Sequence, residues 1–135
     1  MENNQPSVPL PNRRVHTVLG FLRGVSAHDT AEPLALLADD FAYSVVPSQP
    51  TPWRLTSPPL DKARFSQHLA GLFTVFASLR MSPTDMLEDD TSGCLVVCAT
   101  TWGCSGLVSA ADATLLVRLS SDGKLIEEIE EIADF

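Results

Sequence analysis

The chain has 135 residues, of which 44% are hydrophobic and 19% charged, a composition typical of a globular protein with a single core. Its formal net charge of −8 argues against nucleic acids and anionic membranes as partners, because both attract basic surfaces. No apolar run is long enough to span a bilayer, and the N-terminus lacks the pattern of a signal peptide. These features predict a cytoplasmic protein.

The N-terminal segment 1–12, "MENNQPSVPLPN", is polar and rich in proline. It is typical of a short disordered lead, so residues 13–135 are expected to form one domain. Helical spacing of apolar residues predicts a first helix in "RRVHTVLGFLRGVSAHD", residues 13–29. His16 near its start and His28 in the following turn are both expected to face solvent.

Two further helices are predicted before and after a proline-rich loop. Asp29 or Thr30 is expected to cap "AEPLALLADD", residues 31–40, with Pro33 in the first turn, where proline is tolerated. Asp61 is expected to cap "KARFSQHLAGLFTVFASL", residues 62–79. The loop at 48–60 contains four prolines, and its length indicates a functional or mobile segment.

Strands are predicted at "FAYSVVP" (41–47), "MSPTDMLEDD" (81–90), "CLVVCATTWGCSG" (94–106) and "ATLLVRLS" (113–120). The order is helix, helix, strand, helix, then a series of strands. Elements grouped in this way predict an α+β domain with helices on one face of a mostly antiparallel sheet.

The last segment, "GKLIEEIEEIADF", carries isoleucines at every third position, as a helix would. It follows the turn signal "SSDGK", which favours a final strand. Strict alternation cannot place Ile126, Ile129 and Ile132 on one face of a strand. We therefore predict a β-bulge within residues 127–131, and expect most of the glutamates to be solvated.

Three stretches occur in this order: "FLRGVSAHDTAEPLALLADDFAYSVVPS", "LDKARFSQHLAGLF" and the closing "DGKLIEEIEEIADF". Together they resemble the nuclear transport factor 2-like superfamily, and within it the SnoaL-like polyketide cyclase/isomerase family of fungal secondary metabolism. The resemblance implies a cone-shaped α+β barrel of about three helices on a curved sheet. It also implies a homodimer and a mostly apolar pocket between helices and sheet.

Three residues are candidates for acid–base catalysis. His68 lies beside the apolar stripe of its helix, where an imidazole on a pocket wall could move protons. Tyr43 is the only tyrosine, and a buried phenol could donate to a carbonyl or enolate oxygen. Asp112 matches an acidic residue that opens the corresponding strand in the SnoaL-like proteins. Each has an ordinary structural alternative: a half-exposed helix histidine, a core tyrosine and a strand-start aspartate.

A second group of residues is expected to bind substrate. Trp53 and Trp102 could flank a flat apolar molecule, and Glu131 occupies the position of a recurrent glutamate in the family ending. The full set is Phe21, Phe41, Trp53, Leu72, Cys98, Thr100, Trp102 and Glu131.

The three cysteines (Cys94, Cys98 and Cys104) are expected to be reduced, because their number is odd and no secretion signal precedes them. No base accompanies them in sequence, so nucleophilic cysteine chemistry is disfavoured. No metal-ligand spacing or glycine-rich phosphate loop occurs, so no metal and no cofactor are expected.

The sequence and the resemblance together predict an isomerase, cyclase or dehydratase that moves protons on a hydrophobic polyketide or terpenoid-derived intermediate. The alternative is a non-catalytic module of the same fold that binds a small molecule or dimerises. The two differ in whether His68, Tyr43 and Asp112 converge on one point.

Overall fold

The computed structural model describes residues 10–47, 58–76, 78–89, 94–104 and 108–133, with side chains left out at 10–12, 47, 99–104, 108–112 and 133. Residues 1–9 of the predicted lead and residues 48–57 of the predicted loop at 48–60 lie outside these ranges. Residues 10–12, predicted as part of the disordered lead, belong to α1. Three helices and five strands follow one another in the described chain. They are α1 (Leu10–Ser26), α2 (Ala31–Ala35), β1 (Leu37–Pro47), α3 (Lys62–Val75), β2 (Ser78–Asp89), β3 (Cys94–Cys104), β4 (Val108–Leu119) and β5 (Ile126–Ala133).

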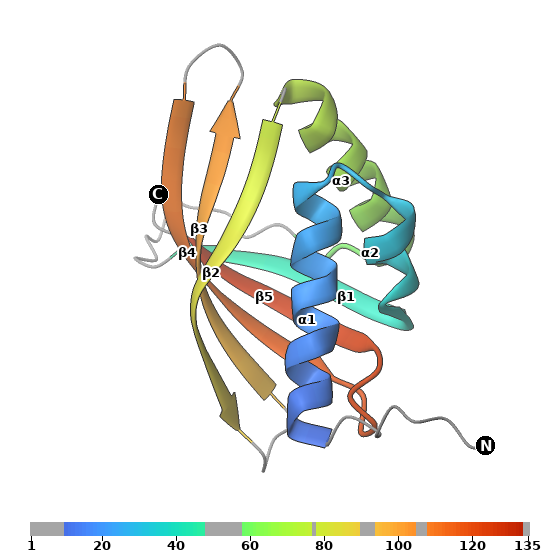
Figure 1. Ribbon diagram of the computed structural model, residues 1–135. Coiled ribbons are helices and arrows are strands. Elements are labelled where there is room, and N and C mark those ends of the chain that lie inside the picture. Colours follow the sequence, from blue (N-terminus) through green and yellow to red (C-terminus); the bar gives the residue numbers. More distant parts are fainter. Residues whose placement is uncertain (1–9, 48–57, 77, 90–93, 105–107, 134–135) are drawn as a thin grey trace, which may run out of the picture.

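The strands form one mixed sheet in the order β1-β5-β4-β3-β2. The β1–β5 pair is parallel, and the other three pairs are antiparallel. The sheet curves strongly without closing into a barrel, and all three helices lie on one of its faces (Figure 1). The predicted α+β class with helices on a curved, mostly antiparallel sheet is confirmed. None of the described helices is both long and apolar enough to cross a membrane.

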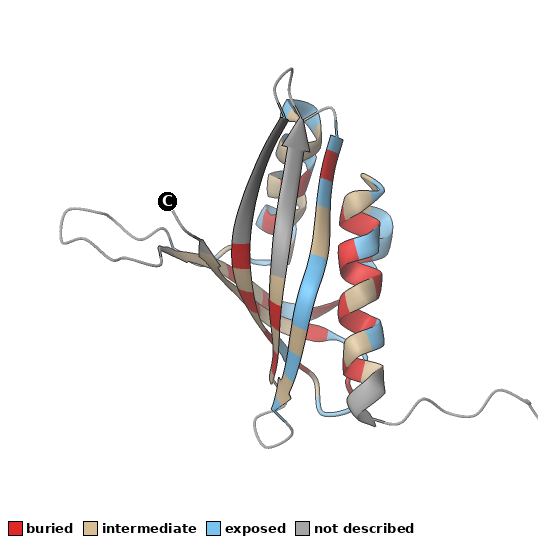
Figure 2. Cartoon of the chain, turned by 60° about the vertical axis from the view of Figure 1, so that its left-hand side comes forward, coloured by how far each residue is buried: buried red, intermediate tan, exposed pale blue. Residues whose placement is uncertain are grey.

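The core fills the space between the helices and the inner face of the sheet, as the buried residues show (Figure 2). Helix α1 packs on β2, and α3 packs on β1. Along the parts of β3 and β4 whose side chains are described, buried apolar residues alternate with less buried ones, so every second residue points inward. The largest fully buried side chains of the core are Val18, Leu22, Pro33, Leu37, Phe41, Leu95, Val97, Val117 and Ile126.

Helix α2 is shorter than the predicted 31–40. It ends at Ala35, and β1 begins at Leu37, four residues before the predicted strand. The Ile126 N–H donates to the Leu36 carbonyl at 2.8 Å, and Leu37 pairs with Ile126. Pairing with β5 therefore overrides the helical propensity of "LALLADD". At the N-terminus Asp29 Oδ1 accepts from the Ala31 N–H at 2.9 Å, so Asp29 supplies the cap.

Helix α3 begins as predicted. Asp61 Oδ1 accepts from the Arg64 N–H at 2.8 Å, which is the expected N-cap contact. The helix ends at Val75, since Phe76 is extended, whereas the sequence predicted a helix as far as Leu79. Leu79 instead belongs to β2, where it is buried.

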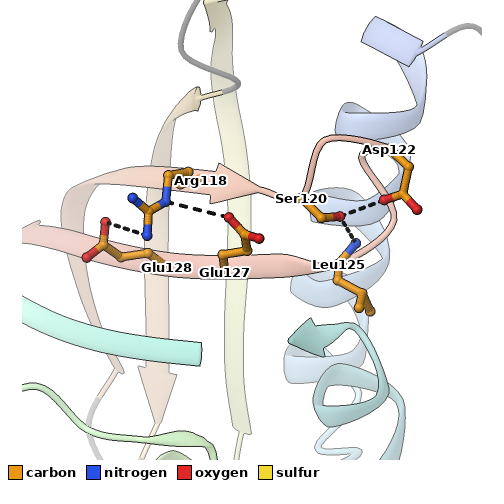
Figure 3. Close-up of polar contacts among 6 residues, drawn as sticks. All are labelled: Arg118, Ser120, Asp122, Leu125, Glu127 and Glu128. Atoms are coloured by element: carbon orange, nitrogen blue, oxygen red, sulfur yellow. Dashed lines mark hydrogen bonds and ion pairs between the residues drawn. The ribbon is translucent and has the colours of Figure 1, made fainter. Parts of the chain in front are cut away.

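The predicted irregularity in the last strand is a β-bulge at Glu127. Arg118 of β4 pairs with Glu128, yet the next residue, Leu119, pairs with Ile126, so Glu127 is the extra residue. Both glutamates lie beside the Arg118 guanidinium, with Glu127 Oε1 3.8 Å from Nε and Glu128 Oε1 3.9 Å from Nη2 (Figure 3). One arginine thus faces the carboxylates of two consecutive residues.

The bulge sets which side chains of β5 point inward. Ile126 and Ile129 are three residues apart, and both are buried, because the extra residue between them shifts the alternation by one. Beyond the bulge, alternation resumes and places Glu131 on the same face as Ile129. Ile132 falls on the opposite face. The helix-like spacing of the isoleucines is therefore explained for two of the three.

Candidate active site

At Tyr43, strand β1 has a backbone neighbour on each side. Tyr43 pairs with Ile129 of β5 on one side and forms an isolated bridge with Leu60 on the other. The bridge consists of two bonds: the Tyr43 N–H to the Leu60 carbonyl at 2.9 Å, and the Leu60 N–H to the Tyr43 carbonyl at 2.8 Å. The next residue, Asp61, caps α3. The start of α3 is thereby fixed relative to Tyr43.

This attachment places two rings of α3 against the Tyr43 ring. The ring centroids of Tyr43 and Phe65 are 5.0 Å apart, and those of Tyr43 and His68 are 5.6 Å apart. Phe65 and His68 lie 6.1 Å from each other. Tyr43 is only 8% exposed, and His68 is half-buried. The aromatic cluster gives the phenol an apolar surrounding on the helix side.

On the sheet side, the Tyr43 phenol meets a carboxylate. Its hydroxyl donates to Glu131 Oε1 at 3.0 Å, across the parallel β1–β5 pair. Burial raises the pKa of Tyr43 well above its ordinary value, and the charge and hydrogen bond of Glu131 raise it further. The phenol therefore remains protonated at neutral pH. It acts here as a donor and not as a base.

The structure brings together three of the residues predicted for the site: Tyr43, His68 and Glu131. The sequence predicted Glu131 only as a substrate-binding residue, whereas the structure joins it directly to Tyr43. The parallel partner of β5 is 88 positions away along the chain, and no local pattern identifies such a partner. Two signals in the sequence pointed to Glu131 itself: its match to a recurrent glutamate of the family ending, and the alternation that places it on the face of Ile129.

Other predicted substrate-binding residues belong to the core around this cluster. The Phe65 ring lies 6.1 Å from Phe21 and 5.2 Å from Phe41, centroid to centroid. Phe41 is 1% exposed, so it has no surface left for a substrate in this conformation. Leu72 is partly buried and packs against the same core.

Strand pairing gives the backbone positions of most of the remaining predicted site residues. Asp112 pairs with Thr100, and Trp102 pairs with Ala110, but the side chains of these residues lie outside the description, as does all of Trp53. Whether Asp112 converges with Tyr43 and His68 therefore stays a prediction. Cys98 alternates with fully buried Val97 on β3, so it occupies the opposite face of the sheet from the core.

Cys94 is poorly suited to nucleophilic chemistry. Burial, followed by the charge of Asp89, raises the pKa of its thiol, and the reactive species is the thiolate. Within the described part of the chain, no group of three or more His, Cys, Asp or Glu residues is arranged to hold a metal ion.

A groove of about 450 Å³ lies away from Tyr43, between α2, the start of β1 and the start of α3. It is lined by Leu34, Asp39, Asp61, Lys62, Ala63 and Ser66. Lys62 Nζ donates to the Leu37 carbonyl at 3.2 Å and lies 4.0 Å from Asp39, so its ammonium already has partners. The chemistry of the Tyr43 cluster is not repeated in this groove.

No sequence-family profile and no curated protein matches the chain. Solved structures do match it. AusH from Aspergillus nidulans aligns with a TM-score of 0.77 and 15% identity, over 96% of this chain and 87% of AusH. BvnE pinacolase from Penicillium brevicompactum aligns with a TM-score of 0.81 and 10% identity, over 97% and 89% respectively.

A putative SnoaL-like polyketide cyclase from Jannaschia gives a TM-score of 0.72 at 15% identity, over 97% of this chain and 92% of that one. Likeness at this level of identity establishes the fold alone. The resemblance drawn from the sequence is confirmed to that extent: the chain has the fold of the SnoaL-like proteins.

Proposed function

Because the chain has a SnoaL-like fold and joins a phenol to a carboxylate beside an imidazole, we propose that it is a cofactor-independent isomerase or cyclase. The observation that carries the proposal is the 3.0 Å hydrogen bond from Tyr43 to Glu131. A carboxylate positioned by a phenol in largely apolar surroundings is suited to removing a proton from carbon.

Glu131 is the proposed general base. Its Oε1 accepts from Tyr43, which leaves Oε2 to take a proton from a carbon next to a substrate carbonyl. Returning that proton to another atom isomerises the substrate. Attack of the resulting enolate on a second carbonyl within the same molecule closes a ring. His68, beside the Tyr43 ring, is the proposed second proton carrier.

The proposed substrate is an apolar, enolisable molecule such as a polyketide or terpenoid-derived intermediate. Support comes from the aromatic surroundings of the Tyr43 phenol, on whose ring Phe65 and His68 pack, and from the titles of neighbours such as the putative polyketide cyclase. The net charge of −8 and the Glu131 carboxylate disfavour an anionic substrate.

Solvent hydrogen exchange into a ketone tests the proposal without knowledge of the natural substrate. In deuterated buffer, the protein is expected to accelerate deuterium incorporation next to the carbonyl of 1-tetralone, an apolar bicyclic ketone. Glu131→Gln is expected to reduce the acceleration about 100-fold or more. Glu130→Gln, which removes the same charge from the opposite face of β5, is the matched control and should retain it.

Full acceleration by Glu131→Gln would reject Glu131 as the base. The non-catalytic alternative predicts a different result: 1-tetralone would shift the nuclear magnetic resonance (NMR) signals of the Tyr43 ring, and no variant would change the exchange rate. That outcome would identify a ligand-binding protein of the same fold.

A further inference from the structure

Two side chains at and just after the end of α1 accept hydrogen bonds from the outer edge of β2. β2 is an edge strand of the sheet, and edge strands leave N–H groups without strand partners. The Met81 N–H donates to Ser26 Oγ at 3.0 Å, and the Leu79 N–H donates to His28 Nε2 at 2.9 Å. We refer to Ser26, His28, Leu79 and Met81 as the edge clasp.

The edge clasp holds three elements together at one corner of the fold, where α1 and α3 end and β2 begins (Figure 1). The His28 ring stacks on Phe73 of α3, with centroids 4.6 Å apart and the planes 14° from parallel. This contradicts the expectation from sequence that His28 faces solvent. A turn position gives no indication that a strand begun 50 residues later will bond to its ring.

The backbone of His28 is fixed in an uncommon conformation. Its φ is 57°, the one positive value found among the described non-glycine residues. The left-handed region is unfavourable for most side chains, although histidine enters it more readily than many. Its N–H donates to the Val25 carbonyl at 3.0 Å, which holds the turn in place. The turn thus directs the ring towards both Phe73 and Leu79.

The hydrogen bond to Leu79 requires one particular protonation state. A ring nitrogen that accepts a hydrogen bond carries no proton, so His28 must be neutral, with its proton on Nδ1. When the ring gains a second proton, Nε2 becomes a donor and faces another donor, the Leu79 N–H. The two groups then repel each other. Ser26 does not titrate, so its bond to Met81 is unaffected.

We propose that the edge clasp is an acid-sensitive latch, in which protonation of His28 releases the beginning of β2 from α1 and α3. The charged residues on the surrounding elements are Arg23 in the last turn of α1, Asp29 in the turn and Arg80 between the two clasped residues of β2. Residues 69–76 of α3, which include Phe73, carry no charge.

The consequence extends along α3. Release of His28 removes the ring stacked on Phe73 and the anchor of Leu79, the first buried residue of β2. Phe65 and His68 lie in the first half of α3, which the Leu60 bridge ties to Tyr43, so acid would loosen the opposite end of the helix, at Phe73. The latch does not depend on the proposed reaction.

NMR of the ¹⁵N-labelled full chain tests the latch directly. At neutral pH, the ring nitrogens of His28 should show the neutral form protonated at Nδ1. The protection factor of the Leu79 amide corrects the exchange rate for its intrinsic pH dependence. As the pH is lowered, this factor should fall about tenfold, and the midpoint of the fall should coincide with the midpoint of the His28 ring titration. A ring protonated at Nε2, or Leu79 protection unchanged through that titration, would overturn the proposal.

Two variants separate the latch from general acid sensitivity. His28→Gln keeps a carbonyl acceptor that cannot gain a proton, so Leu79 protection should no longer depend on pH. Ser26→Ala should reduce Met81 protection by the same factor at every pH. A wild-type pH dependence persisting in His28→Gln would show that another group is responsible. The wild-type measurements decide the matter if a variant fails to fold.

Discussion

The hydroxyl of Tyr43 and the carboxylate of Glu131 are hydrogen-bonded at 3.0 Å, although 88 residues separate them in the chain. Their strands are adjacent and parallel, so the contact exists only once the last strand joins the first. The candidate site therefore requires the pairing of β1 with β5. Five properties that follow from this structure can be measured.

Tyr43 should resist ionisation as long as the protein is folded. Burial and Glu131 raise its pKa, whereas the unfolded phenol ionises near its ordinary value of about 10. Tyr43 is the only tyrosine, so the ultraviolet absorbance of tyrosinate reports on it alone. On alkaline titration, that absorbance should appear at the pH at which the protein unfolds, with unfolding monitored by circular dichroism. This pH should lie well above the midpoint of tyrosinate formation measured in denaturant.

The raised pKa of Tyr43 in the folded protein also means that alkaline pH should lower the stability of the fold. Above pH about 10 the unfolded chain loses the phenol proton while the folded chain keeps it, so the free energy of unfolding decreases as pH rises. Below that pH, this group contributes no slope. Tyr43→Phe should remove this component of the alkaline decrease. An unchanged slope in Tyr43→Phe would mean that other groups cause it.

Two single-residue deletions should have sharply different effects on the ionisation of Tyr43, although the two products have the same amino-acid composition. Removing one residue of the Glu127–Glu128 pair eliminates the bulge and leaves Glu131 on the inner face. Removing one residue of the Glu130–Glu131 pair instead brings Ile132 to the position of the carboxylate. Only the second deletion should lower the alkaline midpoint for ionisation of Tyr43 by removing Glu131. Equal effects would show that the bulge does not set the alternation.

The Arg14–Glu88 pair should matter more than the surface ion pairs. Arg14 Nη1 lies 3.2 Å from Glu88 Oε2, and the two side chains are 8% and 20% exposed. Glu88→Gln removes a negative charge from beside a buried guanidinium and should lower the free energy of unfolding by about 2 to 4 kcal/mol. Replacing both partners, with Arg14→Met and Glu88→Leu, should restore most of it. Urea denaturation measures both, and additive losses would argue against coupling.

Two helical glycines should respond oppositely to alanine. A Cβ on Gly24 would lie 2.7 Å from Pro33 Cγ and 2.8 Å from Cδ, so Gly24→Ala should force α1 and α2 apart and destabilise by about 1 to 3 kcal/mol. A Cβ on Gly71 would meet no atom within 4 Å. Gly71→Ala should therefore stabilise by about 0.5 to 1 kcal/mol through helix propensity. Thermal unfolding compares the pair.

Local signals in the sequence predicted much of the fold. Asp61 is an N-cap followed by an amphipathic helix, and the "SSDGK" turn favours a strand after it, so each element is encoded within a few positions. The errors lie where distant pairing decides. "LALLADD" favours a helix in isolation, and only the contact of Leu36 and Leu37 with Ile126 makes part of it a strand.

The candidate site was less accessible to prediction for the same reason. Tyr43 and His68 were identifiable from their chemistry and their place beside apolar stripes. The partnership of Tyr43 with Glu131 depends on which strands are neighbours, and that of His28 with Leu79 depends on how α1 meets the sheet edge. Neither follows from residue types at a given spacing.

The Tyr43–Leu60 bridge connects β1 directly to the residue before the cap of α3, so it fixes Tyr43, Phe65 and His68 relative to one another. Lengthening a closed loop adds little to its closure entropy. The sequence between β1 and Leu60 could therefore vary in length among related proteins while this arrangement of acid–base groups stayed the same.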